Sequence, residues 1–386
     1  MNALFRIPLR PRDRQRGFSL LEIMVGVAIG LIGIVVIFQV LAVWETRKRT
    51  TTSGSDAQIA GTIAMFNLER DLKLAGYGFG RSTFMGCTVN AYDALRAPNT
   101  FTFALSPVVI TDGAGGAPDT LTVLWGNSAF FVADQTFTTS SDTTKRTRGR
   151  TGFQKGDLVV AAGNSPAQCV LAEVTQNDVA DLAPFTDGAS IGHANMAYTN
   201  FYSGAVVNTR YNNPAGPGIA FTTGSLYNLG PAPQLNTWQI LNARTLASSE
   251  GFRTPTASTE VSEGIADLQA QYGYDNNGNN QIDCPAASAP PACEWTATLT
   301  SPPLTAPINW SRVRAIRVAL LARSQQYEKD AVTTTAPTWA AGAFVMRNVD
   351  GTADSSPGDA NDWRHYRYRV YQAVVPLRNM IWGTLP

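Results

Sequence analysis

A single long apolar run near the N-terminus constrains this chain more than any other feature. From Ile23 to Trp44 the sequence reads IMVGVAIGLIGIVVIFQVLAVW, 22 residues in which Gln39 is the only strongly polar side chain. At 1.5 Å per residue, an α-helix of this length extends roughly 33 Å, which is enough to cross the hydrocarbon core of a bilayer. A secretory signal has a shorter apolar region of about 7–15 residues and a small-residue cleavage site, and neither feature occurs here. The run therefore predicts a membrane-spanning helix.

Charge is distributed unevenly around this run. Residues 1–50 carry eight basic and three acidic side chains, whereas the rest of the chain carries 22 basic and 26 acidic ones. Five arginines precede the run, which predicts a cytoplasmic N-terminus and a periplasmic C-terminal part. Charged residues make up only 15% of the chain, and no basic face for phosphates is expected, so the composition argues against a nucleic-acid-binding protein.

A carboxylate at the start of the apolar run needs an explanation. Glu22 closes the motif R-G-F-S-L-L-E, which begins at Arg16. An acidic group at this depth is costly unless it has a partner or a function. The motif, followed by an unbroken apolar helix, resembles the class III signal of type IV prepilins. This resemblance implies that a prepilin peptidase cuts after Gly17, that Phe18 becomes an N-methylated N-terminus, and that Glu22 acts in assembly.

The chain is expected to have four parts: a cytoplasmic leader (1–17), a transmembrane and assembly helix (18–45), a periplasmic continuation of the helix (46–80) and a periplasmic β-rich domain (81–386). Helical periodicity resumes after Ser55-Asp56, and Gly76 is expected to end the helix as a C-cap. Two apolar stripes should lie on opposite sides of this second half, one formed by Ile59, Ile63 and Phe66 and the other by Met65, Leu68 and Leu72. A helix that is apolar on two faces is usually buried on both, here by its own sheet and by neighbouring subunits.

Beyond residue 80 the chain is rich in Thr, Gly, Asn and Pro, with short β-like runs between turn signals. The predicted strands are Val108–Thr111, Thr120–Trp125, Asp157–Ala161, Val170–Thr175, Ala266–Tyr274, Val313–Ala322 and Tyr366–Val375. We expect an α+β fold of the type IV pilin kind, in which one long N-terminal helix packs on a large, loop-decorated antiparallel sheet.

Several segments sharpen the resemblance. Six segments are similar to segments of PilW-type minor pilins: LERDLKLAGYG, GDLVVAAG, CVLAEVT, VSEGIADLQAQYGYD, WSRVRAIRVALLARS and YRYRVYQAVVPLRN. The resemblance implies a structural subunit, not an enzyme, that primes type IV pilus assembly and sits in the tip complex. Its implied partners are other minor pilins, the major pilin, the prepilin peptidase, the inner-membrane assembly platform and a large tip adhesin. It would leave the inner membrane to join a surface pilus.

Two alternatives remain open at this point. The leader motif is shared with the pseudopilins of type II secretion, so a J-type pseudopilin is the first alternative. The second is a membrane-anchored periplasmic adhesin or binding module that never polymerises.

The four cysteines suggest disulfides outside the cytoplasm. Cys284 and Cys293 flank a short Pro-rich segment, which makes a local disulfide the easiest pairing and leaves Cys87 with Cys169. Four cysteines allow three connectivities, and buried free thiols are the alternative.

Two further motifs carry weaker signals. One segment resembles a calcium loop, with oxygen-bearing side chains at its first, third, fifth and ninth positions, which are Asp275, Asn277, Asn279 and Asp283. Asn280 stands at the usual glycine position and Ala286 where a glutamate would close the site, so a polar hairpin turn is the competing interpretation. The segment Gly188–Gly192 matches G-x-S-x-G beside His193, but its small-residue surroundings favour a loop over a hydrolase elbow. No other cofactor is expected.

Overall fold

The computed structural model describes residues 17–78, 84–130, 134–164, 167–177, 189–215, 220–253, 257–285, 293–299, 310–354 and 361–381. The expected leader, apart from Gly17, therefore lies outside the described residues. The chain divides into two compact units, Met1–Ser53 and Gly54–Pro386.

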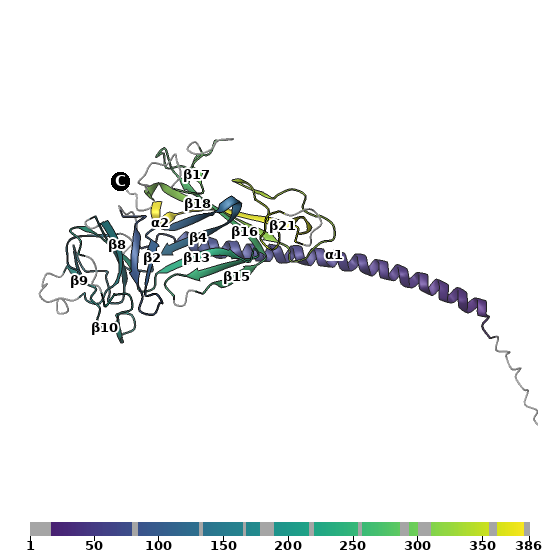
Figure 1. Ribbon diagram of the computed structural model, residues 1–386, viewed down its shortest axis with the longest axis horizontal. Helices are drawn as coiled ribbons and strands as arrows, with labels where there is room; N and C mark the ends of the chain where they lie inside the picture. Colours follow the sequence, from purple (N-terminus) through teal and green to yellow (C-terminus); the bar gives the residue numbers. More distant parts are fainter. Residues whose placement is uncertain are drawn as a thin grey trace, which may run out of the picture. The chain divides into compact units, whose positions relative to one another are not determined.

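One long helix, α1, extends from Leu20 to Leu74 and continues through Ser55-Asp56 without a break (Figure 1). In the first unit its segment Leu20–Glu45 has a mean hydropathy of 2.8 and is exposed along its whole length. By length and composition it is the one helix among the described residues that could cross a membrane. The helix thus has the length and the composition that were predicted for a membrane anchor.

The helix ends at Leu74, two residues before Gly76, which was expected to cap it. Gly76 has a φ of 80°, the left-handed conformation of a helix C-cap. A Cβ at this position would approach Met380 Sδ to 2.9 Å. The chain then turns away, and the Gly76 amide donates to the carbonyl oxygen of Leu124.

Within the described residues, the strands form three main sheets and two small hairpin pairs. The eight-stranded sheet has the order β2 (Thr100–Ala104), β1 (Thr88–Tyr92), β8 (Ala167–Glu173), β7 (Leu158–Asn164), β12 (Gly224–Gly230), β5 (Gln135–Ser140), β6 (Thr144–Thr147) and β9 (Ser190–Gly192). The five-stranded sheet has the order β15 (Thr259–Glu263), β14 (Thr245–Glu250), β13 (Gln234–Leu241), β4 (Ala117–Trp125) and β3 (Val108–Gly113). The four-stranded sheet has the order β17 (Trp295–Thr296), β16 (Ile265–Tyr274), β18 (Val313–Arg323) and β21 (Tyr368–Pro376).

The remaining elements are short. They are the pairs β10 (Ala197–Thr199) with β11 (Val206–Asn208) and β19 (Thr338–Trp339) with β20 (Gly342–Ala343), the 3₁₀ turns Ala114–Gly116, Trp310–Arg312 and Trp363–His365, and the terminal helix α2 (Arg378–Ile381). Among the strands that the structure describes, neighbours pair antiparallel except β1 and β8, which run parallel.

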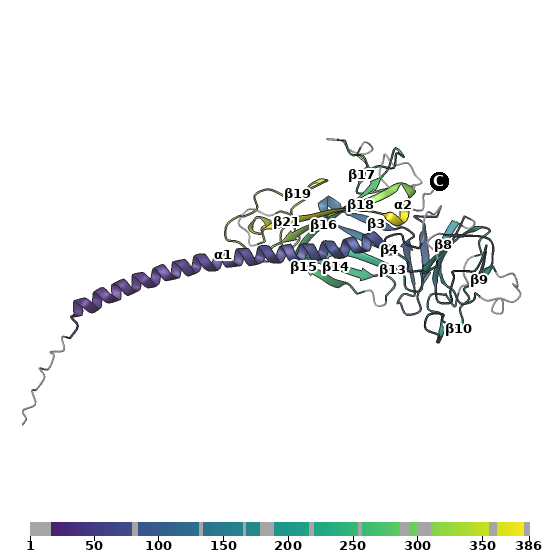
Figure 2. The same cartoon turned by 180° about the vertical axis from the view of Figure 1, so that it is seen from behind.

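One face of the second half of α1 packs on both the four-stranded and the five-stranded sheets (Figure 2). Leu68 and Leu72 belong to one apolar core that also contains Trp238 of β13 and Val318 of β18. The helix approaches β21 closely because residue 61 is a glycine: a Cβ there would lie 2.1 Å from the Tyr371 ring. This core fixes the helix on the two sheets.

The eight-stranded sheet curls on itself. Just beyond the end of β8, the Thr175 amide donates to Gly192 at the end of β9, and Gln176 forms a bridge with the same residue. One face of the sheet packs on the five-stranded sheet through a second apolar core. The other, inner face is filled around β7, β12 and β5 by a third core that includes Phe137, Phe153 and Phe221.

The α+β prediction is confirmed, and all seven predicted strands are present within a few residues of their expected bounds. The strands are distributed over several sheets, whereas the sequence suggested a single one. The reason is that many additional strands, such as β1, β2, β13 and β14, are polar on their outward faces and carry a weak sequence signal.

Candidate assembly interface

The start of α1 is capped by its own side chains. Ser19 immediately precedes the helix, and its Oγ accepts a hydrogen bond from the Leu21 amide at 3.2 Å. Glu22 Oε2 accepts a hydrogen bond from the Ser19 amide at 3.3 Å. This arrangement resembles a capping box, in which a glutamate three residues beyond the cap satisfies the cap's own amide. Glu22 therefore has a partner within its own chain, which the sequence analysis did not anticipate although S-x-x-E is the signal for it.

Gly17 and Phe18 lie in extended chain before the helix. A Cβ at residue 17 would meet no atom within 4 Å, so packing within the described part of the chain does not require a glycine there. The Phe18 ring is exposed. A glycine that the fold itself does not need is consistent with recognition of this bond by another protein.

The second half of α1 has the two opposite apolar faces that were predicted. Met65, Leu68 and Leu72 are buried against the sheets. On the other side, Ile59, Ile63 and Phe66 are 56%, 47% and 67% exposed. We call these three residues the outer stripe. Its spacing of four and three residues places it on one face of the helix, and nothing in the described part of this chain covers it.

A buried carboxylate on the inner face was missed by the sequence analysis. Asp71 Oδ2 accepts hydrogen bonds from Trp238 Nε1 at 3.0 Å and from Asn236 Nδ2 at 2.9 Å. Burial raises the pKa of the Asp71 carboxyl, against the opposing effect of these two hydrogen bonds. An acidic residue within the buried Leu68–Leu72 turn was the signal that could have revealed it.

The structure brings together the cysteine pairs that the sequence favoured. Cys284 is joined to Cys293, nine residues away, and Cys87 is joined to Cys169, 82 residues away. The second disulfide connects the loop before β1 to β8 and so reinforces the parallel pair in the eight-stranded sheet.

The candidate calcium loop is organised by two carboxylates. Asp275 is fully buried, and its two oxygens accept the amides of Gly278 at 2.6 Å and Asn280 at 2.9 Å. Glu294, next to Cys293, accepts three further loop amides through its two oxygens, including that of Asp283 at 2.8 Å. The sequence analysis missed Glu294 because it lies outside the loop motif and reaches it through the Cys284–Cys293 link.

The side chains predicted to bind calcium have other partners in this structure. Asn277 and Asn279 donate from Nδ2 to Asp283 Oδ2 at 3.3 and 2.8 Å. Arg314 Nη2 lies 3.5 Å from Asp275 Oδ2. Among the described residues, no group of three or more His, Cys, Asp and Glu side chains is arranged to hold a metal. Calcium binding by Asp275, Asn277, Asn279 and Asp283 stays a prediction.

The G-x-S-x-G segment does not form a hydrolase elbow in its described part. Ser190 lies inside β9, opposite Arg146 of β6, whereas the elbow needs a serine on a turn between a strand and a helix. The neighbouring His193 is buried, with its Nε2 3.1 Å from Lys145 Nζ. Burial lowers the pKa of Lys145 to about 8, and burial together with the Lys145 charge lowers the pKa of His193 to about 3.

The comparisons with known proteins match two separate regions. Residues 12–38 match the prokaryotic N-terminal methylation motif, and residues 235–379 match the family described as type IV pilus-assembly protein W. No curated protein and no solved structure matches the chain. The first region contains the capped helix start and the second contains most of the sheets that hold α1. Together the two matches support a PilW-type pilin-like protein of the type IV pilus, and the proteins of these families are structural components of the pilus.

Proposed function

We propose that the chain is a minor pilin that primes pilus assembly and sits in the tip complex. The observation that carries this proposal is the outer stripe. Three large apolar side chains at one-turn spacing remain exposed, although the opposite face of the same helix is buried. Burying apolar surface is worth about 25 cal/mol per Å², so a helix from a neighbouring pilin would be a stabilising cover for the stripe.

The size of the β-rich unit supports a place at the end of the filament. This unit spans Gly54–Pro386, and two of its three main sheets pack against one face of the helical segment. A helical filament repeats one head-to-tail contact along its length. A bulky subunit is most easily accommodated at the end, where no further copy has to stack on it.

Processing and topology follow from the N-terminal motif. The prepilin peptidase would cut after Gly17, and Phe18 would become the methylated N-terminus. The C-terminal unit would face the periplasm before assembly and the cell surface afterwards. The expected partners are other minor pilins, the major pilin, the inner-membrane assembly platform and a large tip adhesin.

Two alternatives make different predictions. A J-type pseudopilin of type II secretion would share the leader and the stripe, but the region 235–379 matches the pilus-assembly family. A membrane-anchored binding module that never polymerises would have no use for an exposed apolar stripe. Recovery of the protein in sheared surface filaments separates the pilus role from both.

The decisive variant is Phe66→Asp, because Phe66 is exposed and its replacement leaves the inner core intact. Leu95→Asp is the matched control, since Leu95 is 66% exposed and lies in a turn away from α1. We expect both variants to be cut after Gly17 and to fold, and only Phe66→Asp to be missing from sheared filaments. If the Phe66 variant enters filaments at the wild-type level, the outer stripe is not an assembly contact.

A further inference from the structure

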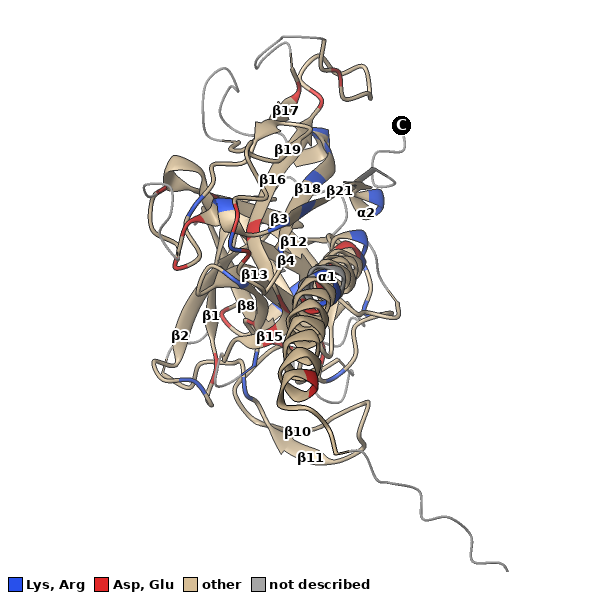
Figure 3. Ribbon diagram, turned by 90° about the vertical axis from the view of Figure 1, so that its right-hand side faces the viewer, with Lys and Arg blue, Asp and Glu red and all other residues tan. Residues whose placement is uncertain are grey.

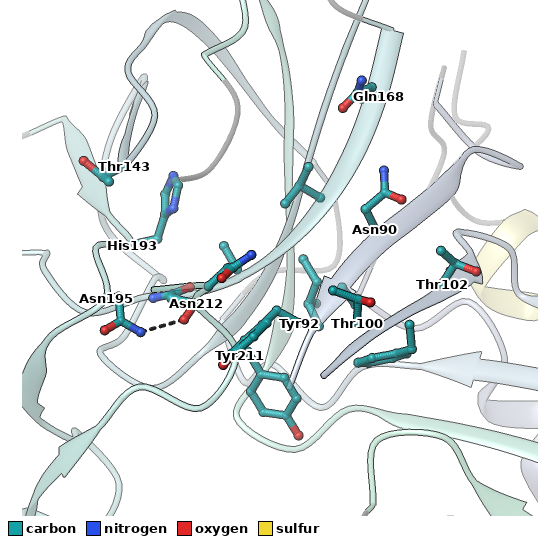
Figure 4. Close-up of a pocket in the computed structure, with 16 residues that line it drawn as sticks. Asn90, Tyr92, Thr100, Thr102, Thr143, Gln168, His193, Asn195, Tyr211 and Asn212 are labelled. Atoms are coloured by element: carbon teal, nitrogen blue, oxygen red, sulfur yellow. Dashed lines mark hydrogen bonds between the residues drawn. The ribbon is translucent and has the colours of Figure 1, made fainter. Parts of the chain in front are cut away.

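A cavity of about 600 Å³ lies on the eight-stranded sheet, outside the region that matches the pilus-assembly family. It opens over β2, β1 and β8, the part of the inner face that the third apolar core does not fill. The opposite wall is formed by Thr143 and His193, which flank β6 and β9, together with Asn195 and the segment Tyr211–Asn213 (Figure 4). The curl of the sheet thus brings residues that flank the strands at one end of the sheet order to the strands near the other end.

The first wall presents side-chain amides and hydroxyls that have no partner. Asn90 of β1 stands opposite Thr102 of β2 and beside Val170 of β8, and Gln168 lies two residues before Val170 on the same face. The side chains of Asn90, Thr102 and Gln168 are exposed. They form no hydrogen bond with any described residue. These donors and acceptors are free for a ligand.

The second wall is rigid. Asn212 is buried, and its side chain accepts the Glu173 amide at 2.8 Å and donates to the Glu173 carbonyl oxygen at 2.8 Å. Asn195 Nδ2 donates to the Asn212 carbonyl oxygen at 2.6 Å, as Figure 4 shows. Just before Asn212, Arg210 forms a bidentate ion pair with the fully buried Asp93, at 2.7 Å for each bond. This network fixes the segment that carries Tyr211 and Asn212.

None of the 16 residues that line the cavity carries a formal charge when His193 is neutral. Acidic and basic residues are instead mixed over the rest of the unit (Figure 3). A charged ligand would lose hydration in the cavity without meeting an opposite charge. Besides amides and hydroxyls, the lining contains the half-buried rings of Tyr92 and Tyr211.

We infer that this cavity binds a neutral saccharide. Each sugar hydroxyl both donates and accepts hydrogen bonds, and a side-chain amide offers a donor and an acceptor side by side. Asn90, Gln168 and Thr102 supply such groups along one wall. The tyrosine rings supply flat apolar surfaces for the C–H face of a sugar ring. A small-ligand site generally combines a few polar groups, which orient the ligand, with aromatic surface.

A peptide fits these observations less well. An extended peptide that adds a strand needs a free sheet edge, which here is the outer side of β2. The cavity instead lies over the face of β2, β1 and β8, where the backbone groups already pair with neighbouring strands. The free groups on this face belong to side chains.

The test uses the full-length chain in dodecylphosphocholine micelles, because alkyl-glycoside detergents would compete for the site. Saturation-transfer difference NMR is recorded with glucose, galactose and N-acetylglucosamine. Glucuronate, galacturonate and glucosamine serve as counterparts that differ chiefly in charge. We expect at least one neutral sugar to bind, and its charged counterpart to bind about tenfold more weakly or not at all. Absence of transfer from all three neutral sugars, or preference for a charged one, overturns the proposal.

Substitutions of lining residues test whether the sugar binds in the cavity. Asn90→Ala combined with Gln168→Ala should lower the affinity for the sugar by about tenfold or more, since a lost hydrogen bond is worth roughly 1 kcal/mol. Asn90→Asp should weaken it as well by adding a charge at nearly constant shape. Asn208→Ala, at an exposed strand position outside the cavity, is the control and should bind as the wild type does. Unchanged binding by the double variant, or displacement of the sugar by a neutral Gly-Ser peptide, contradicts a saccharide site here.

Discussion

The buried carboxylate of Asp71, on α1, accepts a hydrogen bond from the indole N–H of Trp238, on β13, at 3.0 Å. Asp71 is 1% and Trp238 is 3% exposed. The same carboxylate oxygen accepts a second bond from Asn236, whereas Asp71 Oδ1 has no hydrogen bond within the described structure. One acidic group therefore ties the helix to the first strand of the region that matches the pilus-assembly family.

This link predicts different effects for two substitutions of Asp71. Asp71→Ala should destabilise the unit by about 1–3 kcal/mol, because the buried Trp238 indole and the half-buried Asn236 amide lose their acceptor. Asp71→Asn keeps an acceptor oxygen and removes the buried charge, so it should retain most of the stability at neutral pH. Chemical denaturation of the full-length chain in detergent compares the two. Equal losses for both variants would show that the negative charge, and not the acceptor, holds the helix.

A pair of buried carboxyls, Asp119 and Asp267, makes stability depend on pH. Asp119 on β4 accepts the Ala270 amide of β16 at 2.7 Å and so joins the five-stranded to the four-stranded sheet. Burial raises the pKa of Asp119 to about 6 and that of Asp267 to about 7. A carboxyl whose pKa is raised on folding binds its proton more tightly in the folded state. Its stabilising contribution is complete below the unfolded pKa and is lost as the pH rises through the folded value.

The unit should therefore become less stable between about pH 4 and pH 7 on account of these two groups. Asp267→Asn should flatten this part of the profile and raise stability at pH 7.5 by about 1–3 kcal/mol. Urea denaturation at pH 5 and pH 7.5 measures the difference. Asp330→Asn, at an exposed position, should leave the profile as it is. An unchanged slope in the Asp267 variant contradicts the assignment.

The helix and the central strands could be predicted because their patterns are dense and local. Leu68 and Leu72 repeat at helical spacing, and β18 is an almost continuous apolar run buried on both faces. Strand β1 (Thr88–Tyr92) could not be predicted in the same way, since only two of its five residues are buried and the exposed ones are polar. A strand of this kind is defined by its partners, including the Cys87–Cys169 link to β8, and not by its own pattern.

The functional residues, like the strands, could be predicted where their pattern is local in the sequence and not where the fold brings distant residues together. The motif from Gly17 to Glu22 is contiguous and was found from the sequence. Asn90 and His193 line one cavity only because a curled sheet brings its two ends together, which no local pattern encodes. Glu294 reaches the Asp275 loop through a disulfide in the same way.

Glu22 could act in two ways: its oxygen caps the start of α1, and its charge could pair with the Phe18 ammonium during assembly. Glu22→Val removes both the charge and the hydrogen bond to the Ser19 amide. Glu22→Gln removes the charge and keeps an acceptor for that amide. We expect both variants to be cut after Gly17 and both to fail to join other pilins, because pairing with the Phe18 ammonium needs the charge. At about 4 Å and an effective dielectric near 20, that pairing is worth up to roughly 4 kcal/mol before desolvation.

Co-purification with other pilins and the amount of protein in sheared filaments measure the outcome. Normal incorporation of Glu22→Gln together with failure of Glu22→Val would assign Glu22 to helix capping. Normal incorporation of both would remove Glu22 from the assembly interface altogether.

The Asp275 loop gives the last prediction, on calcium. The loop supplies oxygens from Asp275, Asn277, Asn279 and Asp283, and Glu294 lies against its amides. The Arg314 guanidinium lies 3.5 Å from Asp275 Oδ2, so a calcium ion would have to compete with a positive charge at this carboxylate. The affinity of the wild type should therefore be weak, at a dissociation constant of about 10⁻⁴–10⁻³ M as in extracellular calcium modules.

Arg314→Gln removes the competing charge and should tighten calcium binding relative to the wild type. Asp275→Asn should abolish binding, but it also weakens a carboxylate that holds the Gly278 and Asn280 amides, so its folding must be checked. Isothermal titration calorimetry of the full-length chain with calcium chloride gives the affinities, and magnesium chloride is the control for a smaller cation. If neither the wild type nor the Arg314 variant produces heat at millimolar calcium, the loop is a turn held by its own hydrogen bonds, because removing the positive charge beside Asp275 has then exposed no site.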